Sequence, residues 1–327
     1  MGLKRYTARR IAWAGVVALL ILTVTFVLLD LAPDSQLARV QFRAAASGGS
    51  AEAAAEAYAQ RRGLDGPLWA RYLDYLGNLA TGDWGWSDTR SQPVTEAILT
   101  ALPYSLMYTA PAVLISTTLG IAIGLYSAFN QYTKVDYAAT FVAFFGISIP
   151  NFWLGIVLLL VFAVHLGWVP VLFDAELARV RTFSLANARQ LVLPVFVLAT
   201  SAIAGTMRYA RAEALEYVRA AFVKTARAKG ASEWRVLTRH VLRPTLVPLS
   251  TILVGDLLGV ILSASYLVEV VFGIPGLGRL SLEAIRQQDT ALVLGTTLVP
   301  AFVAVIGNLL QDLAYAVLDP RIDYGDR

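Results

Sequence analysis

Residues 207–248 read MRYARAEALEYVRAAFVKTARAKGASEWRVLTRHVLRPTLVP and form the one long charged segment set between two apolar stretches. The segment holds nine Lys and Arg residues against three acids. An apolar residue recurs every three or four positions, which predicts a helix with one apolar stripe. The stripe comprises Leu215, Val218, Phe222 and Ala226.

That helix is expected to end at Gly230, because helix ends often adopt a positive φ that glycine accepts without strain. Ser232 is then a suitable N-cap for a second short helix, and Glu233 lies where the helix dipole favours an acid. Pro244 and Pro248 mark the entry to the next apolar stretch. The segment therefore reads as helix, glycine turn and short helix, a ridge on which a partner protein could push.

The composition places the chain in a membrane. Of its 327 residues 57% are hydrophobic and 15% are charged, whereas soluble domains average about 25% charged residues. A helix needs about 20 apolar residues to span a bilayer. Six segments meet this length, at 11–30, 102–128, 137–165, 190–208, 246–268 and 290–312. The sequence therefore predicts an all-α membrane protein with six transmembrane helices.

The distribution of Lys and Arg gives the orientation. With the N-terminus inside, 16 of these residues fall in cytoplasmic segments and 11 in the longer external ones. Both termini are therefore predicted to be cytoplasmic, and the apolar run 11–29 is expected to remain as an uncleaved first span. The expected parts are the N-terminus with the first span (1–30), an external helical domain (31–101) and a five-helix core (102–327) whose cytoplasmic segment is 208–245.

The external segments contain helices and turns. Helical spacing is expected over Ala51–Arg62 and Pro67–Leu79, and the turn sequence GDWGWS follows at 82–87. Trp84 and Trp86 fit either an interfacial aromatic belt or a contact surface for an external partner. Further along, the glycine- and proline-rich run FGIPGLGR at 272–279 predicts a re-entrant turn at the outer mouth of the helix bundle.

A few residues inside or near the spans admit two readings. Gly120 and Gly124 could seat a neighbouring helix, but a chance pair in a glycine-tolerant span is slightly favoured. Asp256, in the middle of the fifth span, faces either the transport pathway or a hydrogen-bonding neighbour helix. Glu269 and Asp312 lie near span ends and are expected to be solvated there.

Several classes of chemistry are not expected. The chain has no cysteine and only two histidines, His165 and His240, so disulfides, cysteine nucleophiles, metal centres and a histidine-based triad are not predicted. No phosphate-binding G-x-x-x-x-G-K-[ST] sequence occurs, and no pair of acids suits hydrolysis. The pI near 9.3 reflects basic residues at span ends, so the expected partner is membrane lipid and not nucleic acid. No catalytic residue and no cofactor of its own is predicted.

Several blocks, in this order, resemble one family, the inner-membrane permease subunits of ATP-binding-cassette (ABC) importers for dipeptides and oligopeptides. The chain is more closely similar to the first of the two paired permeases in such systems. The blocks are GDWG at 82–85, SIPNFWLG at 148–155, LGWVP at 166–170, TARAKG at 225–230, RHVLR at 239–243, EVVF at 269–272 and PGLGR at 275–279. The resemblance covers nearly the whole chain and implies the type I importer permease fold in the inner, cytoplasmic membrane.

The chain departs from the family pattern in three places. The family's coupling loop has the form E-A-A-x-x-x-G, whereas this chain has Lys224-Thr225-Ala226 before Gly230, a substitution usual in the peptide branch. Residues 32–34 read Ala-Pro-Asp where this branch commonly has Pro-Gly-Asp, and 43–57 is expanded and alanine-rich. The last two changes lie outside, where a binding protein would dock, so they bear on the identity of the substrate.

The resemblance implies partners and roles. The partners are a second homologous permease subunit, two ATPase subunits that carry ATP and Mg²⁺, and an extracellular or periplasmic substrate-binding protein. Coupling to the ATPases is implied at Lys224, Thr225, Ala226, Arg227, Lys229, Gly230, Ala231 and Ser232. An external gate is implied at Glu269, Phe272, Pro275, Gly276, Gly278 and Arg279. ATP-driven closure of the ATPases would switch the permease pair from inward-open to outward-open.

Other functions stay open at this stage. The same importer class also carries oligosaccharides and nickel chelates. A self-sufficient secondary transporter would be supported by inverted repeats, and no clear internal repeat is found. A membrane-bound enzyme is disfavoured by the scarcity of His, Cys and paired acids. A basic cytoplasmic loop by itself would do no more than fix the topology.

Overall fold

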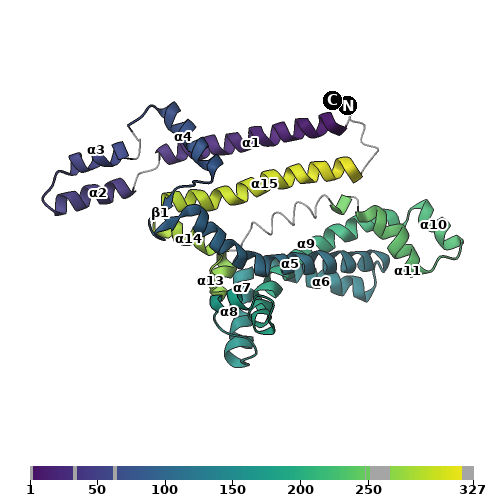
Figure 1. Cartoon of the computed structure of the whole chain (residues 1–327). Coiled ribbons are helices and arrows are strands. Elements are labelled where there is room, and N and C mark those ends of the chain that lie inside the picture. Colours follow the sequence, from purple (N-terminus) through teal and green to yellow (C-terminus); the bar gives the residue numbers. More distant parts are fainter. Residues whose placement is uncertain (1–2, 32–34, 62–64, 247, 251–265, 319–327) are drawn as a thin grey trace. The chain divides into compact units, whose positions relative to one another are not determined.

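The computed structural model describes residues 3–31, 35–61, 65–246, 248–250 and 266–318, and nearly all of them are helical (Figure 1). The helices at the predicted spans and in the charged segment 207–248 are α1 (Leu3–Leu31), α5 (Val94–Phe129), α6 (Lys134–Ser148), α7 (Asn151–Leu158), α9 (Leu185–Val218), α10 (Ala221–Ala228), α11 (Glu233–Arg235) and α15 (Thr290–Leu318). The remaining elements are α2 (Ser35–Ala46), α3 (Ala51–Arg61), α4 (Leu68–Thr81), β1 (Trp86–Ser87), β2 (Gln92–Pro93), α8 (Ala175–Val180), α13 (Tyr266–Phe272), α14 (Leu277–Arg286) and the π-helical segments η1 (Leu159–His165) and η2 (Val236–Val241).

Among the described residues, four helices are long and apolar enough to cross a bilayer, and they coincide with the first, second, fourth and sixth predicted spans. The third predicted span is not one straight helix, since α6 and the α7–η1 helix meet at an angle of 97°. The break falls at Ile149, whose backbone is extended, and at Pro150. A residue before proline avoids the helical region, which explains the position of the bend. The fifth predicted span falls mainly on 251–265, outside the described residues.

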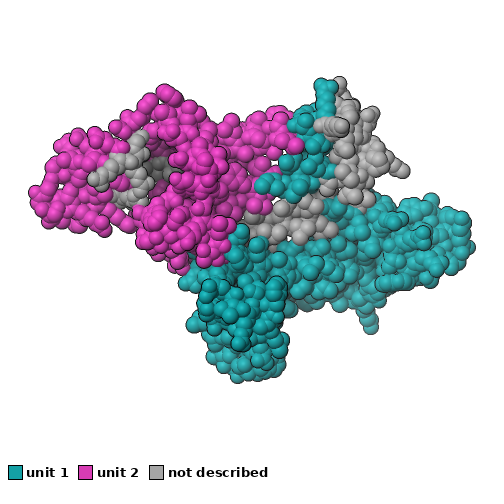
Figure 2. All heavy atoms as spheres, viewed as in Figure 1, with its two compact units in different colours: residues 1–10, 102–279, 306–327 teal, residues 11–101, 280–305 magenta. Residues whose placement is uncertain are grey.

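The contacts divide the chain into two compact units, which Figure 2 shows in separate colours. Unit 1 comprises Met1–Arg10, Leu102–Arg279 and Ile306–Arg327. Unit 2 comprises Ile11–Ala101 and Leu280–Val305. The long helices α1, α5 and α15 contribute residues to both units.

Within unit 1, α5 and α9 approach each other closely through glycine. A Cβ added at Gly120 would lie 2.6 Å from the Cβ of Thr206, and one at Gly124 would lie 2.6 Å from the carbonyl oxygen of Met207. No side chain fits at these distances, so the two glycines do seat a neighbouring helix. The reading of the pair as a chance occurrence is wrong.

Within unit 2, the predicted helices at 51–62 and 67–79 are confirmed as α3 and α4, whereas α2 was not predicted. The turn sequence that follows α4 forms the short antiparallel pair β1–β2. The side chain of Asp289 holds this hairpin: one oxygen accepts hydrogen bonds from the hydroxyls of Ser87 and Thr89, both at 2.7 Å. Its other oxygen caps α15 by accepting from the amide of Leu292.

The pKa of Asp289 reflects this bonding. Burial by itself raises the pKa of the carboxyl group, but the hydrogen bonds from Ser87 and Thr89 outweigh burial and lower it below the ordinary value. Asp289 is therefore ionised at neutral pH and fixes the hairpin to the start of α15.

Candidate functional site

The segment predicted to be cytoplasmic forms an elbow of two short helices at 221–235. Gly230 adopts a φ of 79°, so the predicted positive-φ helix end is confirmed. The next helix begins at Glu233 with Ser232 at the N-cap position. The Ser232 side chain makes no capping hydrogen bond, although its carbonyl oxygen accepts from the amide of Val236. The cap prediction is therefore right in position and wrong in mechanism.

The predicted apolar stripe is confirmed at Leu215, Val218 and Ala226, which face the core, and is wrong at Phe222, because the helix is interrupted. Helix α9 ends at Val218 and α10 begins at Ala221, which rotates the second helix relative to an unbroken one. As a result Val223 is fully buried, whereas Phe222 is 47% exposed. Phe222 and Trp234 (73% exposed) therefore both lie on the face of the elbow that points away from the long helices.

The inner face of the elbow packs on the ends of two long helices. A buried apolar cluster joins α5, α9, α10 and η2, and it comprises Leu125, Ala128, Ala214, Val223, Val236 and Val241. Each buried valine or leucine side chain contributes about 1.5–3 kcal/mol when removed from water. The elbow is therefore packed firmly against the ends of α5 and α9.

Polar contacts tie the same region to the turn between α5 and α6. The guanidinium of Arg211 donates to both carboxylate oxygens of Asp136 at 2.9 Å. Asp136 also accepts from the hydroxyl of Ser127 and from the amide of Tyr132, whose φ is 65°. A tyrosine rarely adopts this conformation, so the carboxylate stabilises a turn that would otherwise be strained.

Two further arginines lie against that turn. Arg219 donates to the side-chain oxygen of Gln131 at 2.8 Å, and the Arg227 guanidinium stands 5.2 Å from the centre of the Phe129 ring. Arg227 also pairs with Glu233 across the elbow. Lys224 and Lys229 are exposed. Among the residues expected to contact an ATPase, Ala226 is instead buried in the chain's own core.

The turn at 273–276, which we call the outer turn after its predicted position, is held by a buried carboxylate. Glu269 is fully buried and accepts hydrogen bonds from the hydroxyls of Ser105 and Tyr108 at 2.7 and 3.1 Å. It also accepts from the amide of Arg279 at 2.7 Å, and the amide of Leu277 donates to Ser105. Glu269 thus fastens the first turn of α14 to α5. The expectation that Glu269 is solvated is wrong, because its partners lie on an element 161–164 residues earlier in the chain.

Of the six residues predicted to form the external gate, Glu269, Phe272 and Gly276 are buried, and the other three are partly exposed. Leu277 is 4% exposed. A Cβ at Gly276 would lie 2.3 Å from a Glu269 carboxylate oxygen and 2.5 Å from the Ser105 hydroxyl. Only glycine fits there. The run at 272–279 is a tight turn over 273–276 followed at once by a regular helix, so its second half is more ordered than predicted.

The two candidate regions lie at opposite ends of α5. The outer turn contacts Ser105, the elbow contacts Phe129, and 24 residues of helix separate these positions by about 36 Å. Asp256, the candidate pathway residue, lies outside the described residues. Sequence reasoning missed Asp136 and Val223. An acid four residues after a tyrosine in a short turn gave no signal that an arginine 75 residues later would pair with it.

The sequence matches a known protein family and several of its members. The model of the binding-protein-dependent transport system inner membrane component matches residues 120–324. The oligopeptide transport system permease protein AppB of Bacillus subtilis is 36% identical over 98% of this chain and 99% of its own length. The di/tripeptide permease protein DppB of Pseudomonas aeruginosa is 36% identical over 80% of this chain and 83% of its own.

A solved structure is similar in fold. It is described as the crystal structure of an amino acid ABC transporter with histidines, and it matches with a TM-score of 0.52 at 15% identity. The match covers 68% of this chain and 95% of that one. At this identity the likeness concerns the fold, which is that of an ABC importer permease.

Proposed function

This chain belongs to the family of binding-protein-dependent transport system inner membrane components, and on that premise we propose that it forms half of the translocation pathway of a peptide importer. It is a multi-pass protein of the cell membrane. The cargo class, dipeptides or oligopeptides, is supported by similarity to peptide permeases along nearly the whole chain. The second permease subunit, the two ATPases with their ATP and Mg²⁺, and the substrate-binding protein are parts of the same proposal.

The elbow at 221–235 is the proposed contact with an ATPase subunit. The observation that carries this proposal is its two-sided character: valines inside, aromatic and basic side chains outside. Trp and Arg are among the residue types that dominate binding energy at protein interfaces. Lys224, Thr225, Arg227, Lys229 and Gly230 remain in the proposed contact, and Phe222 and Trp234 are added to it.

A displacement of the elbow would be passed on by packing. Val223 and Val236 bear on α5 and α9, and the Arg211–Asp136 pair joins α9 to the start of α6. Three helices would therefore move with the elbow as one body. At their far end the Glu269 turn would follow, because it is fastened to α5 by hydrogen bonds. In this proposal the turn positions the outer gate instead of lining it.

Substitution of Trp234 tests the ATPase contact. Trp234→Ala removes a side chain that is 73% exposed, so the chain should fold normally while its affinity for the ATPase subunits falls at least tenfold. The measurement is co-purification and ATP-dependent uptake in proteoliposomes that hold the complete transporter. Trp69→Ala is the matched control, since Trp69 is 69% exposed and lies on α4. Equal ATPase binding by both variants would contradict the proposed contact.

The cargo needs a separate test. Mass spectrometry of ligand co-purified with the cognate binding protein should find a peptide, whereas an oligosaccharide or a nickel chelate would replace that part of the proposal. Uptake driven by an ion gradient without ATPases would point to a secondary transporter. Asp256 is proposed to face the passage between the two permease subunits, and Asp256→Asn should then change the uptake of cationic relative to neutral cargo. Equal uptake of both would remove this role.

A further inference from the structure

Two ion pairs mark the membrane boundaries along α1. At its inner end Arg10 pairs with Asp312 at 3.0 Å, and toward its outer end Asp30 pairs with Arg71 of α4. The 20 residues between Arg10 and Asp30 rise about 30 Å, the thickness of the hydrocarbon core. Asp30 therefore lies near the outer boundary of the hydrocarbon.

Helix α4 reaches below that boundary, although it belongs to the segment predicted to lie outside. The Tyr72 hydroxyl lies 2.6 Å from the hydroxyl of Thr23, and the ring of Tyr72 lies edge-on to that of Phe26. Thr23 precedes Asp30 by seven residues and is therefore about 10 Å deep. The exposed face of α4 carries Trp69 and Leu73, as expected of a helix in contact with lipid.

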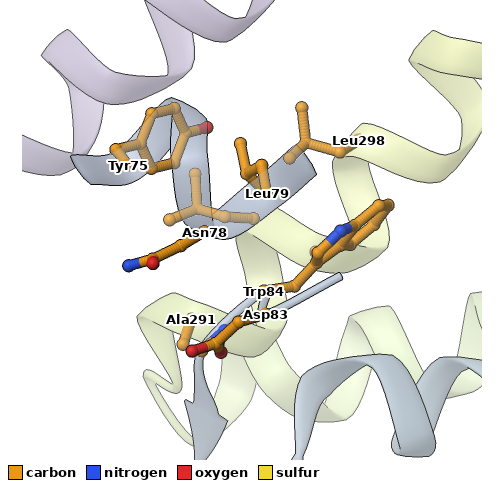
Figure 3. Close-up of a pocket in the computed structure, with 10 residues that line it drawn as sticks. Tyr75, Asn78, Leu79, Asp83, Trp84, Ala291 and Leu298 are labelled. Atoms are coloured by element: carbon orange, nitrogen blue, oxygen red, sulfur yellow. The ribbon is translucent and has the colours of Figure 1, made fainter. Parts of the chain in front are cut away.

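A cavity of about 230 Å³ opens beside α4 at this depth (Figure 3). Its lining residues come from α4, the turn after it and the first turns of α15, and they are Tyr75, Asn78, Leu79, Asp83, Trp84, Gly85, Ala291, Leu294, Gly295 and Leu298. The α15 residues lie within about 12 Å of the outer end of the last predicted span. Both walls thus place the cavity in the outer leaflet.

The chemistry of the walls selects the occupant. Leucines and the Trp84 indole dominate the lining, and the carboxylate of Asp83 already accepts a hydrogen bond from the amide of Gly85. The hydroxyl oxygen of Tyr75 is buried and has no hydrogen-bond partner among the described residues. A buried hydroxyl requires an acceptor, and the lining around the cavity is mostly apolar, as a site for a lipid acyl chain with a polar end would be.

We propose that this cavity is a binding site for an outer-leaflet phospholipid. One acyl chain lies between α4 and the start of α15, and its ester carbonyl oxygen accepts the hydrogen bond from Tyr75. The exposed Trp69 and Leu73 lie in the surrounding lipid. The site would fasten the extramembrane segment to the bilayer, and the inference does not depend on the identity of the cargo.

Photo-crosslinking tests the location. A phospholipid with a diazirine in its acyl chain is incorporated into proteoliposomes that hold the complete transporter, and the labelled peptides are mapped. Labels should concentrate on 75–79 and 291–298, and Leu294→Trp, which fills the cavity, should reduce them at least fivefold. Leu310→Trp, at an exposed position further along α15, should leave them unchanged. Even labelling of all lipid-facing helices, or protection by a partner subunit seated in the cavity, would overturn the proposal.

The Tyr75 hydrogen bond has its own test. Ester-linked phospholipid added to delipidated transporter should raise the Tm of the wild type by several degrees more than that of Tyr75→Phe. Ether-linked phospholipid, which lacks the carbonyl group, should raise both equally. Since Tyr75→Phe removes a hydroxyl that has no partner among the described residues, the variant should fold at least as well as the wild type without lipid. Equal gains from the ester lipid would exclude Tyr75 as its donor.

Discussion

The elbow at 221–235 and the turn at 273–276 both reverse the chain in unit 1, yet they are held in opposite ways. Glu269 and its hydrogen-bonded partners are buried at the turn, and glycine is required where the backbone passes the carboxylate. At the elbow, Gly230 is exposed, and no atom lies within 4 Å of an added Cβ. The turn is fixed by contacts around it, whereas the elbow is fixed by backbone conformation and by valines on one side.

This difference indicates that the turn at 273–276 and the elbow have different roles. A turn held by a buried network of hydrogen bonds is rigid. An elbow with an open outer face keeps its charged and aromatic side chains available for a partner. Substitutions at the turn should therefore act on folding, and substitutions at the elbow should act mainly on coupling.

The largest effect is expected from Gly276→Ala. The new methyl group would overlap Glu269 and Ser105, so the turn must open and leave a buried carboxylate without full hydrogen bonding. The expected loss is about 3 kcal/mol of unfolding free energy. Thermal unfolding of the purified transporter measures it. Gly205→Ala on α9, where an added Cβ meets nothing, is the control and should be neutral or slightly stabilising. Equal stability of the two variants would break the contrast.

Asp136→Asn should have the next largest effect. Asparagine keeps the shape of aspartate but has no negative charge to bind Arg211. Its NH2 group also takes the place of one of the two oxygens that accept hydrogen bonds from Arg211. The expected cost is about 2 kcal/mol, since Arg211 retains some access to water. Chemical denaturation is the measurement, with Glu216→Gln as the exposed control on α9. A cost as small as that of the control would mean that the pair does not fasten the elbow to α6.

Gly230→Val should cost less in stability and more in function. With no atom close by, the cost is only that of a β-branched residue at φ 79°, about 1.5 kcal/mol. ATP hydrolysis should become uncoupled from uptake, as measured together in proteoliposomes. Gly230→Asn, which tolerates the left-handed conformation, should retain most of the coupling. Normal uptake by Gly230→Val would refute the elbow as the coupling element.

The smallest effect concerns acid stability in unit 2, where Asp289 plays a role like that of Glu269. The pKa of Asp289 is lowered in the folded chain, so its stabilisation is complete above the ordinary value of 3.8 and is lost as the pH falls through the folded value. The expected loss is about 1 kcal/mol, the net contribution of one hydrogen bond, and it falls at pH values below the ordinary pKa. Asp289→Asn should flatten this part of the stability profile, and an unchanged profile would show that the hairpin does not depend on the charge.

The sequence by itself determined the membrane class, four of the spans, the positive φ at Gly230 and the family. Apolar length, basic residues and the lack of a Cβ are properties of single residues or of short windows, so no partner needs to be known.

Only the tertiary structure decided which side chains meet. Val223 is buried and Phe222 is exposed because the break at Arg219 and Ala220 rotates α10 relative to an unbroken helix. The need for glycine at 120 and 124 is visible only in the structure, where α9 packs against them. Glu269 was predicted to be solvated, but it accepts a hydrogen bond from Ser105, which is 164 residues away in the sequence. Whether a polar group is solvated or paired depends on the elements that cover it, and that information is not contained in the spacing of its neighbours.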